Sequence, residues 1–136
     1  MNILISLIIQ NPYFAQFVPN NISKIKTNIV SGLSFFIHIV KVCNKYKTLN
    51  TGQLIELYRD QKTMFNIINK FAYWDNMINY NNTKKVFSDL IKKIYNINLE
   101  NKYKKLINKY YIFGLNKQEK YKLWKINKIL FKRKIR

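Results

Sequence analysis

The first residues of the chain carry a short hydrophobic stripe. Residues 3–9 are almost wholly apolar, and their strongest positions recur at helical spacing instead of alternating as in a strand. Those positions are Ile3, Leu4, Leu7 and Ile8. The run is shorter than the roughly 20 apolar residues that span a bilayer, and no Lys or Arg precedes it as in a secretory signal. The pattern predicts a buried first helix.

Proline and short polar residues mark the next elements. Asn11 followed by Pro12 is typical of a helix start and predicts a short second helix. Pro19 and the polar run 20–28 predict a loop. Ser31 is then placed to cap a third helix, whose apolar content indicates burial on most sides. Two more short helices are expected before residue 75.

The first of those two helices is expected to begin at Thr51, an N-cap residue type, with Leu54 and Tyr58 behind it on one face. The second carries an apolar face as far as Phe71, and residues 74–75 are expected to close it.

Two longer helices are expected in the C-terminal part of the chain. No glycine or proline interrupts residues 84–111, where apolar residues recur at three- and four-residue steps. Such a helix is about 42 Å long, more than a small globule covers, so its far half is expected to project. Gly114 is expected to end it. Asn116 and Glu119 form a variant of the capping box that opens the last helix, which completes a hairpin.

Composition supports one all-α domain. The 136 residues include only three glycines and two prolines, fewer than a protein with many tight turns needs. The predicted fold class is all-α: a helical bundle followed by a long helix and a projecting C-terminal helical hairpin. The single Cys43 cannot form an internal disulfide, which fits a reducing cytoplasm.

The formal net charge of +19 leaves several interpretations open. Lysines that neutralise phosphates favour nucleic acid as a partner. The chain is also crowded with Lys, Asn, Ile, Tyr and Phe, residues with AT-rich codons, so genomic drift would place lysine on any solvated helix face. A basic surface attracts acidic proteins as well.

No residue pattern indicates a catalytic or metal site made from this chain alone. The acidic residues are scattered and lack a neighbouring base. His38 stands alone on a helix expected to be buried, so a core histidine is predicted instead of a metal ligand. Cys43 has no CxxC partner and is predicted to lie in the core, and Gly52 belongs to no phosphate-binding loop.

Four segments together resemble a known family. They are residues 1–19 (MNILISLIIQNPYFAQFVP), 51–59 (TGQLIELYR), 74–75 (WD) and 114–127 (GLNKQEKYKLWKIN). In this order and at nearly this spacing they resemble the C-terminal domain of the bacterial replicative primase of the DnaG type, over essentially the whole chain. The resemblance implies a helical bundle at 1–97 and a helical hairpin at 98–136, neither of which polymerises RNA.

The resemblance implies that the hairpin docks onto the N-terminal domain of the hexameric DnaB-type helicase, bringing primase to the replication fork and stimulating the helicase. The docking positions carried over to this sequence are Leu115, Trp124, Asn127, Lys128, Ile129, Phe131 and Lys132. For Trp124, packing within the hairpin is the alternative.

The resemblance also implies a second site, on the bundle, for the acidic C-terminal tail of the single-stranded DNA-binding protein. Its positions here are Met1, Ile5 and Lys70. An acidic tail that ends in an aromatic residue suits an apolar floor beside a cation. Core packing is the alternative for Ile5, and a simple exposed charge is the alternative for Lys70.

The resemblance assigns primer synthesis, zinc and magnesium to upstream primase domains outside this sequence, so no cofactor is expected here. It implies a cytoplasmic location at the replication fork, in the nucleoid, without a membrane, and a monomer when free. Two alternatives remain: a basic helical nucleic-acid-binding accessory protein that uses the lysines and tyrosines of the hairpin, and a degenerate remnant with weakened partners.

Overall fold

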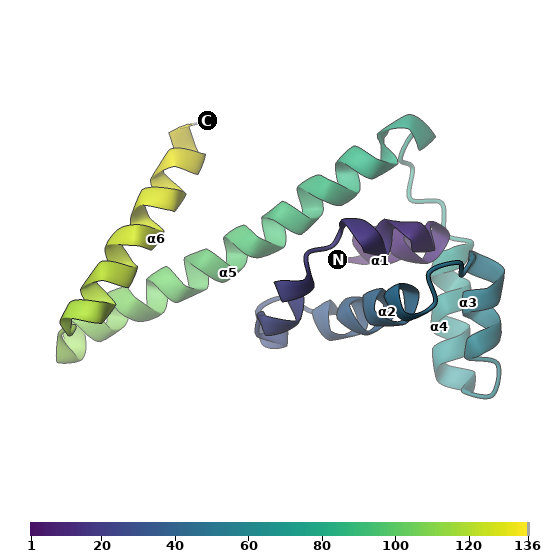
Figure 1. The fold of residues 1–136 in the computed structure, drawn as a ribbon, viewed down its shortest axis with the longest axis horizontal. Coiled ribbons are helices and arrows are strands. Elements are labelled where there is room, and N and C mark those ends of the chain that lie inside the picture. Colours follow the sequence, from purple (N-terminus) through teal and green to yellow (C-terminus); the bar gives the residue numbers. More distant parts are fainter. Residues whose placement is uncertain (136) are drawn as a thin grey trace. The chain divides into compact units, whose positions relative to one another are not determined.

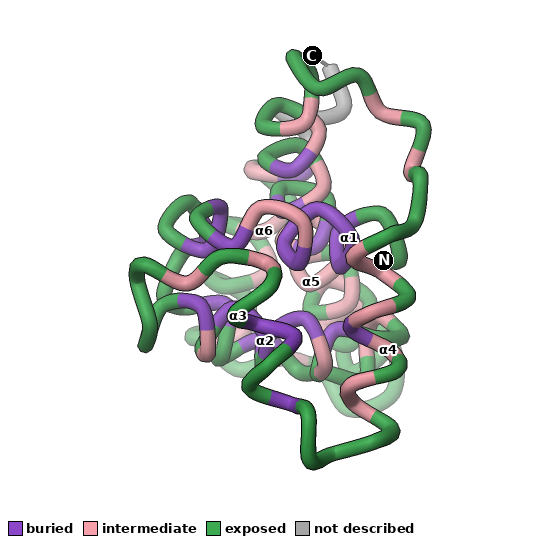
Figure 2. Tube along the Cα trace, turned by 90° about the vertical axis from the view of Figure 1, so that its right-hand side faces the viewer, coloured by how far each residue is buried: buried purple, intermediate pink, exposed green. Residues whose placement is uncertain are grey.

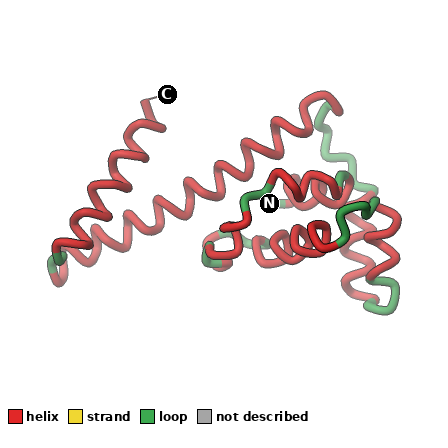
Figure 3. Tube along the Cα trace, viewed as in Figure 1, coloured by secondary structure: helices red, strands yellow, loops and turns green. Residues whose placement is uncertain are grey.

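The computed structural model describes residues 1–135, with side chains described as far as Leu130, and every regular element in that range is a helix (Figure 3). The predicted all-α fold class is confirmed. The chain divides into two compact units, Met1–Ile91 and Lys92–Arg136. We call them the bundle unit and the hairpin unit. The assignment of separate roles to residues 1–97 and 98–136 stays a prediction.

The bundle unit contains four complete α-helices and the start of a fifth (Figure 1). They are α1 (Asn2–Gln10), α2 (Leu33–Lys45), α3 (Thr51–Leu57), α4 (Lys62–Ala72) and the first residues of α5 (Thr83–Phe113). Short 3-10 helices lie between them: η1 (Pro12–Phe17), η2 (Asn20–Lys24), η3 (Thr27–Ile29) and η4 (Tyr80–Asn82). None of the described helices is both long enough and apolar enough to cross a bilayer.

Helix α1 forms the centre of the bundle unit. Its residues from Leu4 to Ile9 are all buried (Figure 2), and α1 packs against α2, α3, α4 and η1. The buried Ser6 is satisfied because its Oγ donates a hydrogen bond to the Ile3 carbonyl at 2.7 Å and accepts one from Asn76 Nδ2 at 3.1 Å. The predicted buried first helix is therefore confirmed.

An aromatic cluster attaches the start of α5 to the bundle unit. The ring of Phe87 lies 5.1 Å from that of Phe14 in η1 and 6.2 Å from that of Phe36 in α2, centroid to centroid. All three side chains are almost completely buried. Aromatic rings of this size bury large apolar areas, so this cluster contributes strongly to the stability of the unit.

The C-terminal end of α1 is tied to α3 and α4 by side-chain hydrogen bonds. Thr51 Oγ1 donates to the carbonyls of Ile9 at 2.9 Å and Gln10 at 3.2 Å. Gln10 Nε2 in turn donates to the carbonyls of Phe71 at 3.0 Å and Trp74 at 2.8 Å. The last carbonyls of a helix lack partners within the helix, and here tertiary contacts supply them.

Two predicted N-caps are wrong by one residue. Helix α2 is capped by Gly32, at φ +86°, and not by Ser31. Helix α3 is capped by Asn50, which accepts a hydrogen bond from the Gln53 N–H in a reciprocal capping box, and not by Thr51. The Thr51 hydroxyl is instead used in the contact with α1, which local sequence could not reveal.

The segment after α1 also differs from its prediction. The helix expected from Asn11 is a 3-10 helix, and the Asn11 side chain does not cap it but donates to the Leu7 carbonyl at 3.1 Å. The predicted loop at 20–28 contains the short helices η2 and η3. Both differences concern short segments, and short helical segments that connect longer elements often take the 3-10 form.

His38 is exposed, so the prediction of a core histidine is wrong. Its Nε2 lies 2.7 Å from the hydroxyl oxygen of Tyr58, which is itself buried. The buried side of α2 is formed by residues such as Phe36, Val40 and Cys43, and helical periodicity turns position 38 away from them. Cys43 is buried as predicted, and burial raises the pKa of its thiol to about 11.

The hairpin unit consists of the rest of α5 and of α6 (Lys117–Ile135), joined by a short turn. Gly114 ends α5 at φ +74°, a conformation that favours glycine, as predicted. The Glu119 N–H donates to Asn116 Oδ1 at 2.8 Å and the Asn116 N–H donates to Glu119 Oε1 at 3.4 Å. This confirms the predicted capping box at the start of α6.

Candidate partner-binding surfaces

One face of α6 presents aromatic and basic side chains to solvent. Trp124 is 57% exposed, and its ring centroid lies 6.1 Å from that of Tyr121 and 5.2 Å from Lys128 Nζ. Asn127 is exposed on the same side by helical spacing. We call Tyr121, Trp124, Asn127 and Lys128 the outer face. Three predicted docking residues are thus brought together, and packing within the hairpin covers less than half of Trp124.

The other predicted docking residues are placed differently. Leu115 in the turn and Ile129 in α6 are half-buried, and Ile129 falls on a different side of the helix from Trp124. The side chains of Phe131 and Lys132 lie outside the described residues. Leu130 is buried, so it is not free to contact a partner.

A groove of about 480 Å³ lies between α5 and α6 within the hairpin unit. It is lined by three aliphatic and four lysine residues: Leu99, Lys102, Lys105 and Leu106 of α5, and Lys122, Lys125 and Ile126 of α6. We call it the lysine groove. Helical spacing turns Lys122 and Ile126 away from Trp124, whereas Lys125 lies one turn after Tyr121, so the groove borders the outer face. The sequence analysis missed it.

The end of α5 carries an exposed apolar segment that the sequence analysis also missed. Tyr110, Tyr111, Ile112 and Phe113 are all more than half exposed, and Phe113 reaches 82%. Four consecutive large apolar residues point in all directions around a helix, so one neighbouring helix cannot cover them. The run of four large apolar residues just before Gly114 could therefore have predicted an exposed apolar segment at the end of α5.

The predicted tail-site residues are brought only partly together. Met1 and Ile5 both lie close to Gly32. A Cβ added at Gly32 would lie only 2.9 Å from Met1 Cγ and 3.5 Å from Ile5 Cδ1. Ile5 is only 4% exposed, so it belongs to the core. Lys70 is exposed in the last turn of α4, next to Phe71, whose carbonyl is bound by Gln10 at the far end of α1.

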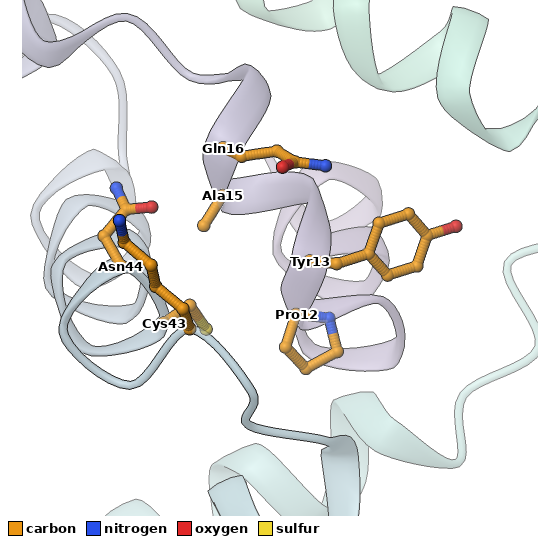
Figure 4. A pocket seen from close by; sticks show the side chains of 7 residues that line it. Pro12, Tyr13, Ala15, Gln16, Cys43 and Asn44 are labelled. Carbon is orange, nitrogen blue, oxygen red and sulfur yellow. The ribbon is translucent and has the colours of Figure 1, made fainter.

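A smaller hollow of about 160 Å³ lies between η1 and α2 (Figure 4). Its lining includes Tyr13 and Gln16 on one side and Cys43, Asn44 and Lys47 on the other. The predicted tail-site residues do not line it. Because the Cys43 thiol has its pKa raised to about 11 by burial, it is protonated at neutral pH and is a poor nucleophile.

Positive charge is concentrated in the hairpin unit. Residues 92–136 contain 15 Lys and Arg against two acidic residues, and so carry +13 of the net +19. Residues 1–91 contain ten against four, and carry the remaining +6. Within the described part of the chain, no group of three or more His, Cys, Asp or Glu side chains is placed to hold a metal ion.

Comparisons with known proteins agree on one family. The family model described as DNA primase DnaG DnaB-binding matches residues 1–126. The DNA primase of Buchnera aphidicola subsp. Baizongia pistaciae is 41% identical over 133 residues, which are 98% of this chain and 23% of that relative. The DNA primase of Escherichia coli K12 is 32% identical over 133 residues, again 98% of this chain and 22% of that relative.

A solved structure supports the same assignment. The C-terminal domain of the DnaG primase from Vibrio cholerae matches with a TM-score of 0.71 and 29% identity, covering 93% of this chain and 96% of that domain. The chain spans less than a quarter of the length of the full primases. The resemblance of the four segments is confirmed, and this all-α chain belongs to the DnaB-binding family of DnaG-type DNA primases.

Proposed function

We propose that this chain docks a DNA primase onto a DnaB-type replicative helicase at the replication fork. The observation that supports the helicase as the partner is the match of the DnaB-binding family model to residues 1–126. The exposed outer face of α6 supports the hairpin unit as the docking element, since a protein interface uses aromatic anchors that a monomer leaves uncovered. Trp124, with Lys128 beside its ring, is such an anchor.

The roles of the docking residues follow from their exposure. Trp124, Asn127 and Lys128 contact the helicase directly from the outer face. Leu115 and Ile129 are half-buried and contribute at the edge of that contact. The basic surroundings speed association with an acidic partner and add salt dependence, while the aromatic anchor determines how long the complex lasts.

The segment itself is non-catalytic in this proposal. Primer synthesis belongs to the full-length relatives, of which this chain covers only 23%. The acidic residues of the bundle unit are dispersed, and Glu119 in the hairpin unit is engaged with Lys109 and the start of α6. The Glu119 carboxylate is engaged in a helix cap and an ion pair, so we assign it a structural role and not that of a catalytic base.

We also propose that the bundle unit holds the acidic tail of a single-stranded DNA-binding protein. Met1 offers an apolar contact beside Gly32, and Lys70 offers a cation in the last turn of α4. Lys70 is next to Phe71, whose carbonyl accepts a hydrogen bond from Gln10 at the end of α1 far from Met1. Helix α1 is about 14 Å long, a length that an extended peptide covers with about four residues.

The docking proposal is tested by titrating this chain with the helicase hexamer of the same organism, at low and high salt, beside single-stranded DNA. Docking through an aromatic anchor predicts helicase binding that survives high salt. The alternative function, a basic nucleic-acid-binding accessory protein, is favoured by the +13 of the hairpin unit. It predicts binding to DNA alone, lost steeply as salt rises because phosphate contacts release counterions.

A further inference from the structure

We infer that the lysine groove binds an acidic amphipathic α-helix of the helicase partner. The inference rests on the proposed docking function and adds a second contact surface with its own chemistry. The groove lies within the hairpin unit and borders the outer face at Lys125. A helix seated there would be recognised by apolar and acidic side chains together.

The groove combines an aliphatic floor with basic walls. Leu99, Leu106 and Ile126 provide the apolar surface, and lysines stand on both sides of it. An amphipathic helix lays its apolar stripe into such a groove. Asp and Glu residues beside that stripe would then meet Lys102 on α5 and Lys122 and Lys125 on α6.

The size of the groove fits a helix of about two turns. Its α5 wall runs from Leu99 to Leu106, which is about 10 Å along the axis. Anchors at i, i+4 and i+7 of a partner helix cover the same distance. The volume of about 480 Å³ accommodates such anchors but not a whole globular surface.

The charge of the hairpin unit points to an acidic partner. Its only carboxylate side chains are Glu100 and Glu119, and Glu119 is paired with Lys109. Neither glutamate lines the groove. Closely spaced lysines repel one another, so carboxylates on a partner relieve that repulsion when they bind.

A protein helix fits the groove better than nucleic acid does. Single-stranded nucleic acid is held by bases stacked on aromatic side chains, whereas the described residues that line the groove are aliphatic residues and lysines. The exposed ring of Trp124 lies on the outer face, turned away from Lys122 and Ile126, while Tyr121 stands at the border of the groove, one turn before Lys125. A helicase that used both surfaces would hold α6 from two sides.

A pair of charge-reversal variants tests the inference. Lys102→Glu with Lys125→Glu reverses one lysine on each wall of the groove. The matched control is Lys93→Glu with Lys104→Glu, which changes the net charge equally. Both control lysines are exposed on α5, and Lys104 is turned by about 200° from Lys102. Each variant is first checked for unchanged helicity by circular dichroism.

The readout is the Kd for the helicase hexamer of the same organism. The groove variant is expected to bind at least about tenfold more weakly and the control less than about threefold more weakly, since reversed charges would face the partner's carboxylates only in the groove. Equal weakening by both variants, or none by the groove variant, overturns the inference. Failure of the unmodified chain to bind the helicase overturns the docking proposal itself and is therefore distinguishable.

Two further measurements keep the inference testable if a variant misfolds. Methyl groups of Leu99, Leu106 and Ile126 are expected to shift in NMR spectra when the helicase N-terminal domain is added to the unmodified chain. Shifts confined to other residues contradict the groove as a contact. Loss of single-stranded DNA binding by the groove variant, with helicase binding intact, would assign the groove to nucleic acid and overturn the inference.

Discussion

Lys109 of α5 and Glu119 of α6 form an ion pair across the turn of the hairpin unit. The same Glu119 carboxylate accepts the Asn116 N–H and so closes the capping box of α6. One carboxylate therefore links the end of α5, the turn and the start of α6. The hydrogen bond from Lys109 is the main cause that holds the pKa of Glu119 below its ordinary value of 4.5.

This pairing predicts a pH dependence of the hairpin turn. A carboxyl whose pKa is lowered by folding stabilises the fold above its ordinary pKa, and that contribution is lost as the pH falls below 4.5 through the lowered value. Amide protons in the first turn of α6 are therefore expected to exchange faster as the pH falls through this range, after correction for intrinsic rates. In Glu119→Gln this additional acid-induced opening should be absent, while the exposed Glu100→Gln should behave as the unmodified chain. Identical profiles in all three proteins would refute the linkage.

Gly32→Ala is expected to destabilise the bundle unit by more than about 1 kcal/mol. Gly32 has φ +86°, and a Cβ there would come to 2.9 Å from Met1 Cγ. Gly52→Ala is the matched control. A Cβ at Gly52 would lie 3.5 Å from Asn50 Oδ1, an ordinary contact, and the position is helical, where alanine is favoured over glycine. Urea denaturation should show a lower midpoint for the first variant and an unchanged or higher one for the second; equal midpoints would contradict the strain at Gly32.

Lys70→Glu is expected to weaken binding of the acidic tail peptide of the single-stranded DNA-binding protein by about tenfold or more, since it replaces attraction by repulsion. Helicase binding should be unchanged. Lys62→Glu, exposed at the other end of α4, is the control for a general charge effect. Fluorescence anisotropy with a labelled tail peptide gives the Kd. Equal loss of both partners by Lys70→Glu would indicate unfolding, and equal weakening by both variants would remove Lys70 from the site.

Trp124→Ala is expected to weaken helicase binding by about tenfold or more without lowering stability, because the ring is an exposed anchor. Leu130→Asp is the contrasting variant. It places a charge at a buried position, so docking should be lost together with helicity of the hairpin unit. Calorimetric titration and circular dichroism separate the two effects. Full helicase affinity in Trp124→Ala, or in a Leu130→Asp variant whose hairpin unit has lost its helicity, would refute the outer-face model.

The local signals in the sequence determined the helices and their C-terminal turn. Gly114 ends α5, and the box formed by Asn116 and Glu119 opens α6, because each of these devices operates within one helical turn. The stripe that begins at Ile3 predicted a buried helix for the same reason, and of its four positions Leu4, Leu7 and Ile8 are buried while Ile3 is exposed. The four segments that resemble the primase family identified that family without any knowledge of the fold.

Only the tertiary structure decided which groups meet across long stretches of chain. Thr51 resembles a cap, yet its hydroxyl binds the carbonyl of Ile9 and leaves the capping to Asn50. The lysine groove exists because α5 and α6 bring particular faces together, joining Leu99 to Ile126. Helical periodicity predicts which residues share a face of a helix. It does not predict which of those faces is covered by another helix. That choice depends on packing between residues far apart in the sequence.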